Sequence, residues 1–107
     1  MELISRDELK EKLDRGDNFK LVNALSEFAF RAKHIPGSLN VPTPEDAMKM
    51  LDPADEIVIH CSSPSCQVSV NVYNLLKANG YTNVCRYAGG IQDWEEAGYP
   101  LEGVVVE

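Results

Sequence analysis

Short apolar runs alternate along the chain with segments in which apolar residues recur at helical spacing. The runs are rich in β-branched residues and predict strands, whereas the longer periodic segments predict amphipathic helices. Strands that alternate with helices are typical of a parallel sheet with helices on both faces. We therefore predict a single α/β domain over residues 1–107, with about four or five parallel strands at its centre. The predicted strands cover residues 19–24, 39–42, 56–60 and 84–87, with an edge strand in the tail at 101–107.

Residues that start and stop helices mark the ends of the amphipathic segments. The first helix is predicted to begin at a capping box, residues 5–8, and to end at Gly16. Another begins at Thr43, with Pro44 at its first position. A later helix, which ends at Gly80, is predicted to bury one stripe of side chains. The stripe contains Val68, Val72, Leu75, Leu76 and Asn79.

The most informative stretch is residues 57–67, where an apolar run ends at Cys61, a small polar loop follows, and an amphipathic helix begins. The loop therefore lies at a helix start, where unpaired backbone N–H groups and the positive end of the helix dipole converge. A thiol placed there is biased toward thiolate, with a pKa lowered to roughly 3.5–7.5 from about 8.5. We predict that Cys61 is the catalytic nucleophile. The loop backbone is predicted to bind substrate through Ser62, Ser63, Pro64, Ser65, Cys66 and Gln67.

The other cysteines have different predicted roles. Cys66 is either a packing thiol at the helix start or a redox partner of Cys61 that acts as a resolving thiol, and the residues alone leave both open. Cys85 lies in a predicted strand and is expected in the core. Cys61, Cys66 and His60 make a poor set of zinc ligands, so we expect no metal site and no cofactor.

The remaining polar candidates are expected to be structural. His34 lies beside the Pro36-Gly37 turn and is expected to make a structural hydrogen bond rather than to act as a general base. Strand alternation sends His60 and Cys61 to opposite faces, so His60 is expected to be a hydrogen-bonded core imidazole rather than a general base. Arg31 and Arg86 can approach the site from neighbouring loops, but both are expected to be solvated.

Composition and charge argue against nucleic-acid and membrane partners and against a disulfide-rich protein. The chain has a net charge of −7 and scattered Lys and Arg residues, which argues against nucleic acid, since a duplex demands a basic face. No apolar stretch approaches the roughly 20 residues that span a bilayer, so no membrane partner is expected. The first residues do not form a signal peptide, and the expected location is the cytoplasm, where thiols stay reduced. The odd number of cysteines suits reactive thiols better than a disulfide framework.

Several separated stretches share their residues and spacing with one known family. Phe30, the run at 34–42 and the apolar strand that ends in Cys61 carry the first half of the match. The second half is carried by Gly80-Tyr81, Asn83-Val84, Gly89-Gly90, Trp94 and Gly98-Tyr99-Pro100. Together these stretches resemble the single-domain rhodanese-like sulfurtransferases. The resemblance implies a three-layer fold in which a Cys61 persulfide passes sulfane sulfur from a donor, thiosulfate or a persulfide, to a thiol acceptor or a partner protein.

The chain departs from that family's usual pattern at the positions that would bind substrate. Residues 23–25 are Asn-Ala-Leu where the family usually has an acidic residue, an apolar residue and Arg, and Lys33 stands where it usually has Gly. The loop after Cys61 is slightly longer than usual and contains no cation. An anionic donor would therefore meet backbone amides but no basic side chain from the loop. The departures leave the expected fold unchanged and leave the physiological donor and acceptor open.

Other functions fit the same residues. The domain can instead be a non-catalytic sulfur carrier or protein-binding module, or a thiol redox protein that uses Cys61 and Cys66. Cell-cycle dual-specificity phosphatases and arsenate reductases resemble this architecture, but their cysteine is followed, after a short loop, by Arg. The corresponding position here is Gln67, whose neutral amide does not match a phosphoryl group, so phosphatase activity is disfavoured. No oligomeric state is predicted, and a monomer is compatible with the pattern.

Overall fold

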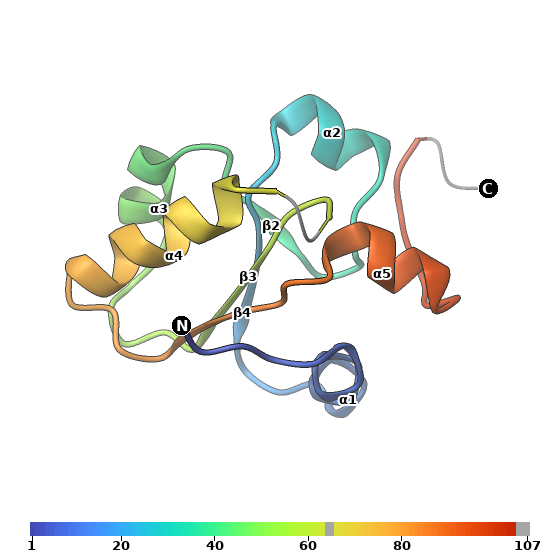
Figure 1. Ribbon diagram of the computed structural model, residues 1–107, viewed down its shortest axis with the longest axis horizontal. Coiled ribbons are helices and arrows are strands. Elements are labelled where there is room, and N and C mark those ends of the chain that lie inside the picture. The colour runs from blue at the N-terminus through green and yellow to red at the C-terminus, as the bar shows by residue number, and fades with distance from the viewer. Residues whose placement is uncertain (64–65, 105–107) are drawn as a thin grey trace.

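A computed structural model of the protein describes residues 1–63 and 66–104. Within these residues the sheet has the strand order β2-β1-β3-β4, and every neighbouring pair is parallel (Figure 1). The predicted α/β class and parallel sheet are confirmed, and each predicted internal strand is present but shorter at its ends. The strands are β1 (Lys20–Asn23), β2 (Leu39–Asn40), β3 (Ile57–His60) and β4 (Val84–Arg86).

Helices cover both faces of the sheet, as the alternation predicted. α3 and α4 pack on one face, whereas α1 and α5 pack on the other (Figure 1). α2 follows β1 and lies near the carboxyl ends of the strands (Figure 1). The helices are α1 (Arg6–Arg15), α2 (Glu27–Ala32), α3 (Pro44–Met50), α4 (Val68–Ala78) and α5 (Gly90–Glu96).

The core has two layers because successive side chains of each strand point to opposite faces. Val22 and Ile59 belong to the layer under α3 and α4, whereas Leu21 and Val58 belong to the layer under α1 and α5. All of β3 is buried, which explains why its sequence is apolar up to the last residue rather than alternating. The sheet therefore presents β3 as a rigid central support for whatever follows it.

The predicted helix ends are confirmed. The Ser5 hydroxyl accepts a hydrogen bond from the Glu8 backbone N–H at 3.1 Å, and Glu8 returns the bond to the Ser5 N–H, so the capping box is complete. α1 ends at Gly16. The Thr43 hydroxyl caps α3 through the Asp46 N–H, with Pro44 in the first turn. These local signals fix the helix ends without help from the rest of the fold.

The predicted buried stripe of α4 is wrong in part. Val72 and Leu76 are buried, but Val68 and Asn79 are exposed and Leu75 is half-buried. Ser69 and Tyr73 are buried instead, since the helix turns a partly polar face toward β4 and the N-terminal segment. The Tyr73 hydroxyl accepts from the Glu2 backbone N–H at 3.0 Å, and the Ser69 hydroxyl accepts from an arginine on β4. Hydrogen bonds, rather than apolar contact alone, therefore set the rotation of α4.

The two terminal segments each make one isolated β-bridge. The N-terminal segment pairs with β4, and the segment near the C-terminus pairs with the residues after α2. Leu3 pairs with Arg86 in parallel, and Glu102 pairs with His34 in antiparallel orientation. The predicted edge strand at 101–107 is reduced to this last bridge within the described residues, and residues 105–107 lie outside them. In the described part of the chain, no helix combines the length and the apolar character needed to cross a membrane.

Candidate active site

Cys61 follows β3 directly, at the edge of the sheet where the carboxyl ends of the parallel strands meet. In open parallel sheets, ligands bind outside this edge. Cys61 is only 2% exposed, so the protein covers it almost completely. The placement of Cys61 at the end of a buried strand, predicted from the apolar run, is confirmed.

The first turn of α5 holds the backbone at Cys61. The Ile91 N–H donates to the Cys61 carbonyl at 3.0 Å, and the Gln92 N–H donates to the Ser62 carbonyl at 2.8 Å. This close approach needs glycine at position 90. Gly90 has φ +67°, and a Cβ added there would lie 2.7 Å from the Cys61 carbonyl oxygen. The amides at the start of α5 therefore bind the loop itself rather than a ligand.

A disulfide joins Cys61 to Cys66, and their Cα atoms are 6.4 Å apart. The Cys66 N–H donates to the Ser63 carbonyl at 3.1 Å, so the described ends of the loop fold back toward each other. The alternative in which Cys66 is only a packing thiol, out of reach of Cys61, is not the arrangement seen. Pro64 and Ser65, which were also predicted to bind substrate, lie outside the described residues.

α4 begins behind the loop, and among the described residues its first N–H groups have no side-chain cap. Gln67 is the N-cap residue, its own side chain makes no capping bond there, and the first turn contains no acidic residue. Uncapped N–H groups and the helix dipole favour negative charge in front of the helix. This environment suits a thiolate or persulfide in the loop, and substrate binding by the loop stays a prediction.

Arg86, which the sequence analysis named as able to approach the site, lies on β4 with a buried side chain. The expected solvated side chain is wrong, because Arg86 is only 8% exposed and its Nε–H donates to the Ser69 hydroxyl at 2.9 Å. Arg86 pairs in register with Ile59, so both point to the face of the sheet that α4 covers. Cys61 comes two positions after Ile59, so the same alternation assigns it to the face that α4 covers. Arg31, by contrast, is exposed and pairs with Glu27 on its own helix, as expected.

An Arg86→Met variant is expected to make Cys61 a weaker nucleophile, since a buried cation on the same face of the sheet favours the thiolate. In the reduced protein, we expect alkylation of Cys61 at neutral pH to slow about fivefold, with the pH–rate profile moved toward higher pH. Peptide mapping after timed iodoacetamide treatment measures this for each cysteine. Arg86→Lys should restore part of the rate, and the exposed Arg31→Met should change nothing. An unchanged profile in a folded Arg86→Met variant would contradict the assignment.

His60 is a buried imidazole whose surroundings are less polar than predicted. Within the described residues neither ring nitrogen makes a well-formed hydrogen bond, so the expectation of a hydrogen-bonded imidazole is wrong. Its register partner Asn23 is also fully buried and leaves its Nδ2 unpaired there. Burial lowers the pKa of His60 to about 4, with the Val22 backbone opposing the shift. His60 therefore stays neutral, and alternation places its ring on the face away from Cys61.

This buried imidazole predicts a loss of stability in mild acid. The folded-state pKa of His60, about 4, lies below the ordinary value of 6.5, so the unfolded chain takes up a proton first as the pH falls. The contribution of neutral His60 to stability is fully present above about pH 6.5. As the pH falls from 6.5 to 5, the free energy of unfolding should drop by about 2 kcal/mol. Urea unfolding at several pH values measures the slope. A His60→Leu variant should lack this part of the slope, and an equal slope in both proteins would contradict the prediction.

The structural hydrogen bond predicted for His34 is confirmed, whereas Cys85 packs against the core without being fully buried. The His34 Nδ1 lies 2.8 Å from the Phe30 carbonyl oxygen, and its ring stacks on the Phe30 ring with centroids 4.1 Å apart. Cys85 is half-buried against the layer under α1 and α5, and burial raises its pKa to about 11, so it is a poor nucleophile. Among residues 1–63 and 66–104, no three His, Cys, Asp or Glu side chains gather closely enough to hold a metal ion.

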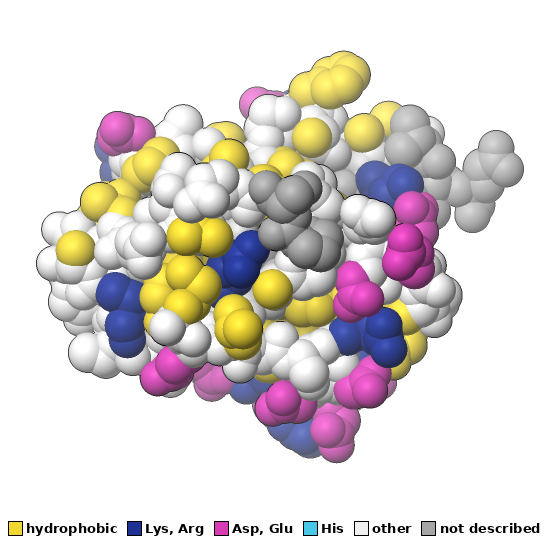
Figure 2. Space-filling model, viewed as in Figure 1, with side chains coloured by type: hydrophobic (Ala, Val, Ile, Leu, Met, Phe, Trp, Pro, Cys, Tyr) yellow, Lys and Arg dark blue, Asp and Glu magenta, His cyan; other side chains and the backbone are white. Residues whose placement is uncertain are grey.

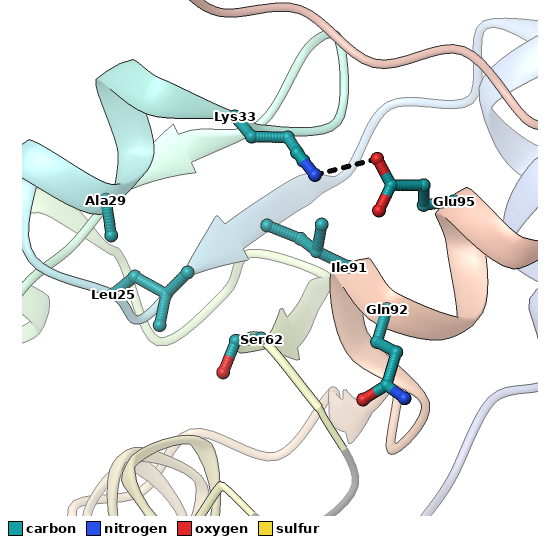
Figure 3. A pocket seen from close by; sticks show the side chains of 7 residues that line it. All are labelled: Leu25, Ala29, Lys33, Ser62, Ile91, Gln92 and Glu95. Atoms are coloured by element: carbon teal, nitrogen blue, oxygen red, sulfur yellow. Dashed lines mark hydrogen bonds and ion pairs between the residues drawn. The ribbon is translucent and has the colours of Figure 1, made fainter. Parts of the chain in front are cut away.

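A pocket of about 280 Å³ opens beside Ser62. Figure 3 shows the Leu25 and Ile91 side chains facing the space between Ser62 and an ion pair at the rim. The ion pair joins Lys33 Nζ to Glu95 Oε2 at 2.7 Å. The lining is thus largely apolar, with one charge of each sign at its edge. The described part of the loop has no basic side chain, but Lys33 places one at the rim of the pocket. Lys33 is one of the positions at which the sequence departs from the resembled family.

Acidic side chains are concentrated on one part of the face that Figure 2 draws. Figure 2 shows Asp and Glu side chains gathered over α5 and α1, with a smaller number of Lys and Arg side chains among them. This distribution agrees with the net charge of −7. A field of this sign repels polyanions and is compatible with small or basic ligands.

Comparison with known proteins places this geometry in a family. The sequence pattern described as a rhodanese-like domain matches residues 5–97. Among curated proteins, the HTH-type transcriptional regulator Rv0324 of Mycobacterium tuberculosis is 29% identical over 101 residues, which cover 92% of this chain and 44% of the regulator. The chain therefore spans less than half the length of that relative.

Solved structures show the same fold. The rhodanese-like domain of the Alr3790 protein from Anabaena sp. has a TM-score of 0.84 and 25% identity, over 98% of this chain and 81% of that chain. The human single-domain sulfurtransferase TSTD1 has a TM-score of 0.74 and 26% identity, over 90% of this chain and 96% of that chain. Both comparisons cover nearly the whole sheet and its helices.

Proposed function

Because this chain belongs to the family of rhodanese-like domains, we propose that it is a sulfurtransferase whose sulfur-carrying residue is Cys61. The observation that carries the proposal is the position of Cys61. It lies at the carboxyl end of β3, with its carbonyl fixed by the start of α5 and with the start of α4 behind its loop. The human sulfurtransferase of similar structure adds support.

The proposed reaction has two displacements at sulfur. The reduced Cys61 thiolate attacks the outer sulfur of thiosulfate or of a persulfide donor, a new S–S bond forms, and sulfite or the donor thiolate leaves. The acceptor thiolate then attacks the terminal sulfur of the Cys61 persulfide and takes it, which regenerates the Cys61 thiolate. The α4 N–H groups and Arg86 favour the negative charge that Cys61 carries before and after loading.

The same geometry suggests the classes of donor and acceptor. The apolar pocket beside Ser62, with Lys33 and Glu95 at its rim, suits a small thiol that bears both charges better than a bare inorganic anion. The acidic surface argues against nucleic acid as a partner. Since the cycle needs a reduced Cys61, the proposal places the protein in a reducing compartment such as the cytoplasm. It includes no cofactor.

A sulfur-carrier role is the second candidate, and the relative named as a transcriptional regulator favours it. That relative is more than twice as long as the match, so this kind of domain occurs within a larger protein. In such a role Cys61 would load sulfur and deliver it, or report its presence, without repeated turnover.

One experiment separates these candidates. The reduced protein is incubated with thiosulfate or with a cysteine-derived persulfide, and then with an excess of a small thiol, and the persulfide transferred to that thiol is quantified. Many turnovers support the enzyme, whereas loading followed by a single transfer supports the carrier. Absence of both loading and transfer would leave a protein-binding module and would contradict the proposal.

A further inference from the structure

Cys66 is held where it can react with a sulfur atom on Cys61. The Cα atoms of the two residues are 6.4 Å apart, within the range that a disulfide spans. Each residue is attached to a rigid element, Cys61 to β3 and to the start of α5, and Cys66 to the start of α4. The proximity is therefore supported by the elements on either side of the loop as well as by the disulfide itself.

The two thiols are not equivalent. Cys61 is almost fully buried, whereas Cys66 is partly exposed and sits just before Gln67, the N-cap residue of α4. Cys66 lies next to the start of this helix and is the more accessible of the two thiols. Cys85 cannot take its place, because it packs on the other face of the sheet and burial raises its pKa to about 11. Among the described cysteines, Cys66 is thus the nucleophile that faces Cys61.

We propose that Cys66 is a second catalytic thiol that resolves the Cys61 persulfide and releases its sulfur as sulfide. This inference rests on the proposed loading of Cys61. The Cys66 thiolate attacks Sγ of Cys61, the Cys61–Cys66 disulfide forms, and the bond to the terminal sulfur breaks, so that hydrosulfide leaves. The terminal sulfur is reduced to sulfide while the Cys66 sulfur is oxidised, and Sγ of Cys61, already oxidised on loading, keeps its oxidation state, so atoms and electrons balance.

A dithiol reductant completes the cycle. Its first thiolate attacks the Cys61–Cys66 disulfide, its second thiol closes a disulfide on the reductant, and both protein thiols return to the reduced state. The disulfide in the structure corresponds to the product of the resolving step. In this scheme an external acceptor and Cys66 compete for the same persulfide, so the absence of an acceptor turns sulfur transfer into sulfide release.

The test follows one sulfur atom through matched variants. Wild type, Cys61→Ser, Cys66→Ser and Cys85→Ser are reduced, freed of reductant without oxygen, and exposed briefly to thiosulfate and, separately, to a cysteine-derived persulfide. After desalting, sulfide is assayed over time and intact mass spectrometry reports persulfide and disulfide. Wild type and Cys85→Ser should release sulfide in equimolar amount to the sulfur loaded, and their mass should become that of the internal disulfide.

Cys66→Ser should load the same sulfur, release no sulfide and retain the persulfide for about tenfold longer or more. If wild type and Cys66→Ser load equally and keep the persulfide equally long, the resolving role is overturned while the sulfurtransferase proposal stands. If no variant gains sulfur and none releases sulfide with either donor, the sulfurtransferase proposal fails, and this one fails with it. Loading that survives in Cys61→Ser would also overturn both.

Discussion

A Cys61→Ser variant is expected to transfer no sulfur from any donor to any acceptor. Serine has nearly the same size, but its hydroxyl is not ionised near neutral pH and does not form the S–S bond on which both displacements depend. The cradle around position 61 is made by backbone groups, namely the Cys61 and Ser62 carbonyls and the amides of α5. The substitution should therefore leave the loop in place while removing its chemistry.

This variant also removes the disulfide, so Cys66→Ser is its matched control. Both variants lack the Cys61–Cys66 bond, but only Cys66→Ser keeps the sulfur-carrying thiol. We expect sulfur transfer to an excess of acceptor thiol to be lost below detection in Cys61→Ser and retained in Cys66→Ser. Equal losses in the two variants would indicate that the disulfide, and not Cys61 itself, supports the activity.

A Gly90→Ala variant is expected to lose about 4 kcal/mol of unfolding free energy. Gly90 has φ +67°, a conformation that costs a residue with a side chain about 1–2 kcal/mol. The added Cβ would also lie 2.7 Å from the Cys61 carbonyl oxygen and 2.9 Å from the Ser63 backbone nitrogen. Backbone atoms cannot rotate away as a side chain can, so either α5 or the loop after Cys61 must move.

Gly98→Ala separates the two causes. Gly98 has φ +78°, but a Cβ added there would meet no atom of the described residues within 4 Å, so alanine should cost only about 1–2 kcal/mol. Chemical denaturation of the reduced proteins gives both values. Gly90→Ala should in addition slow sulfur loading in the fraction that remains folded, whereas Gly98→Ala should not. Equal losses of stability and unchanged loading would show that α5 does not position the loop.

The parts of the fold that the sequence predicts are those specified by neighbouring residues. The Ser5 capping box, the Thr43 cap and the continuous apolar run of β3 each act within a few positions, and all are confirmed. The place of Cys61 follows in the same way, because it needs only a buried parallel strand that is followed by a helix.

The features that were mispredicted depend on pairings between distant segments. Arg86 is buried because β4 lies beside β3 in a register that turns residue 86 toward α4, and Ser69 meets it there. Neither ring nitrogen of His60 makes a well-formed hydrogen bond within the described residues, and the side-chain oxygen of its register neighbour, Asn23, accepts from the Leu25 N–H. Neither the strand order nor the register can be read from residues 84–87 or 56–60 alone.

The position of sulfur on the loaded protein tests the central claim most directly. The reduced protein is treated with a cysteine-derived persulfide, its free thiols and persulfides are trapped by alkylation, and peptides are mapped by mass spectrometry. On the Cys66→Ser background, where the persulfide is expected to persist, we predict one added sulfur on the peptide that contains Cys61 and none on the peptide that contains Cys85. Unmodified Cys61, or added sulfur on Cys85 alone, would contradict the account.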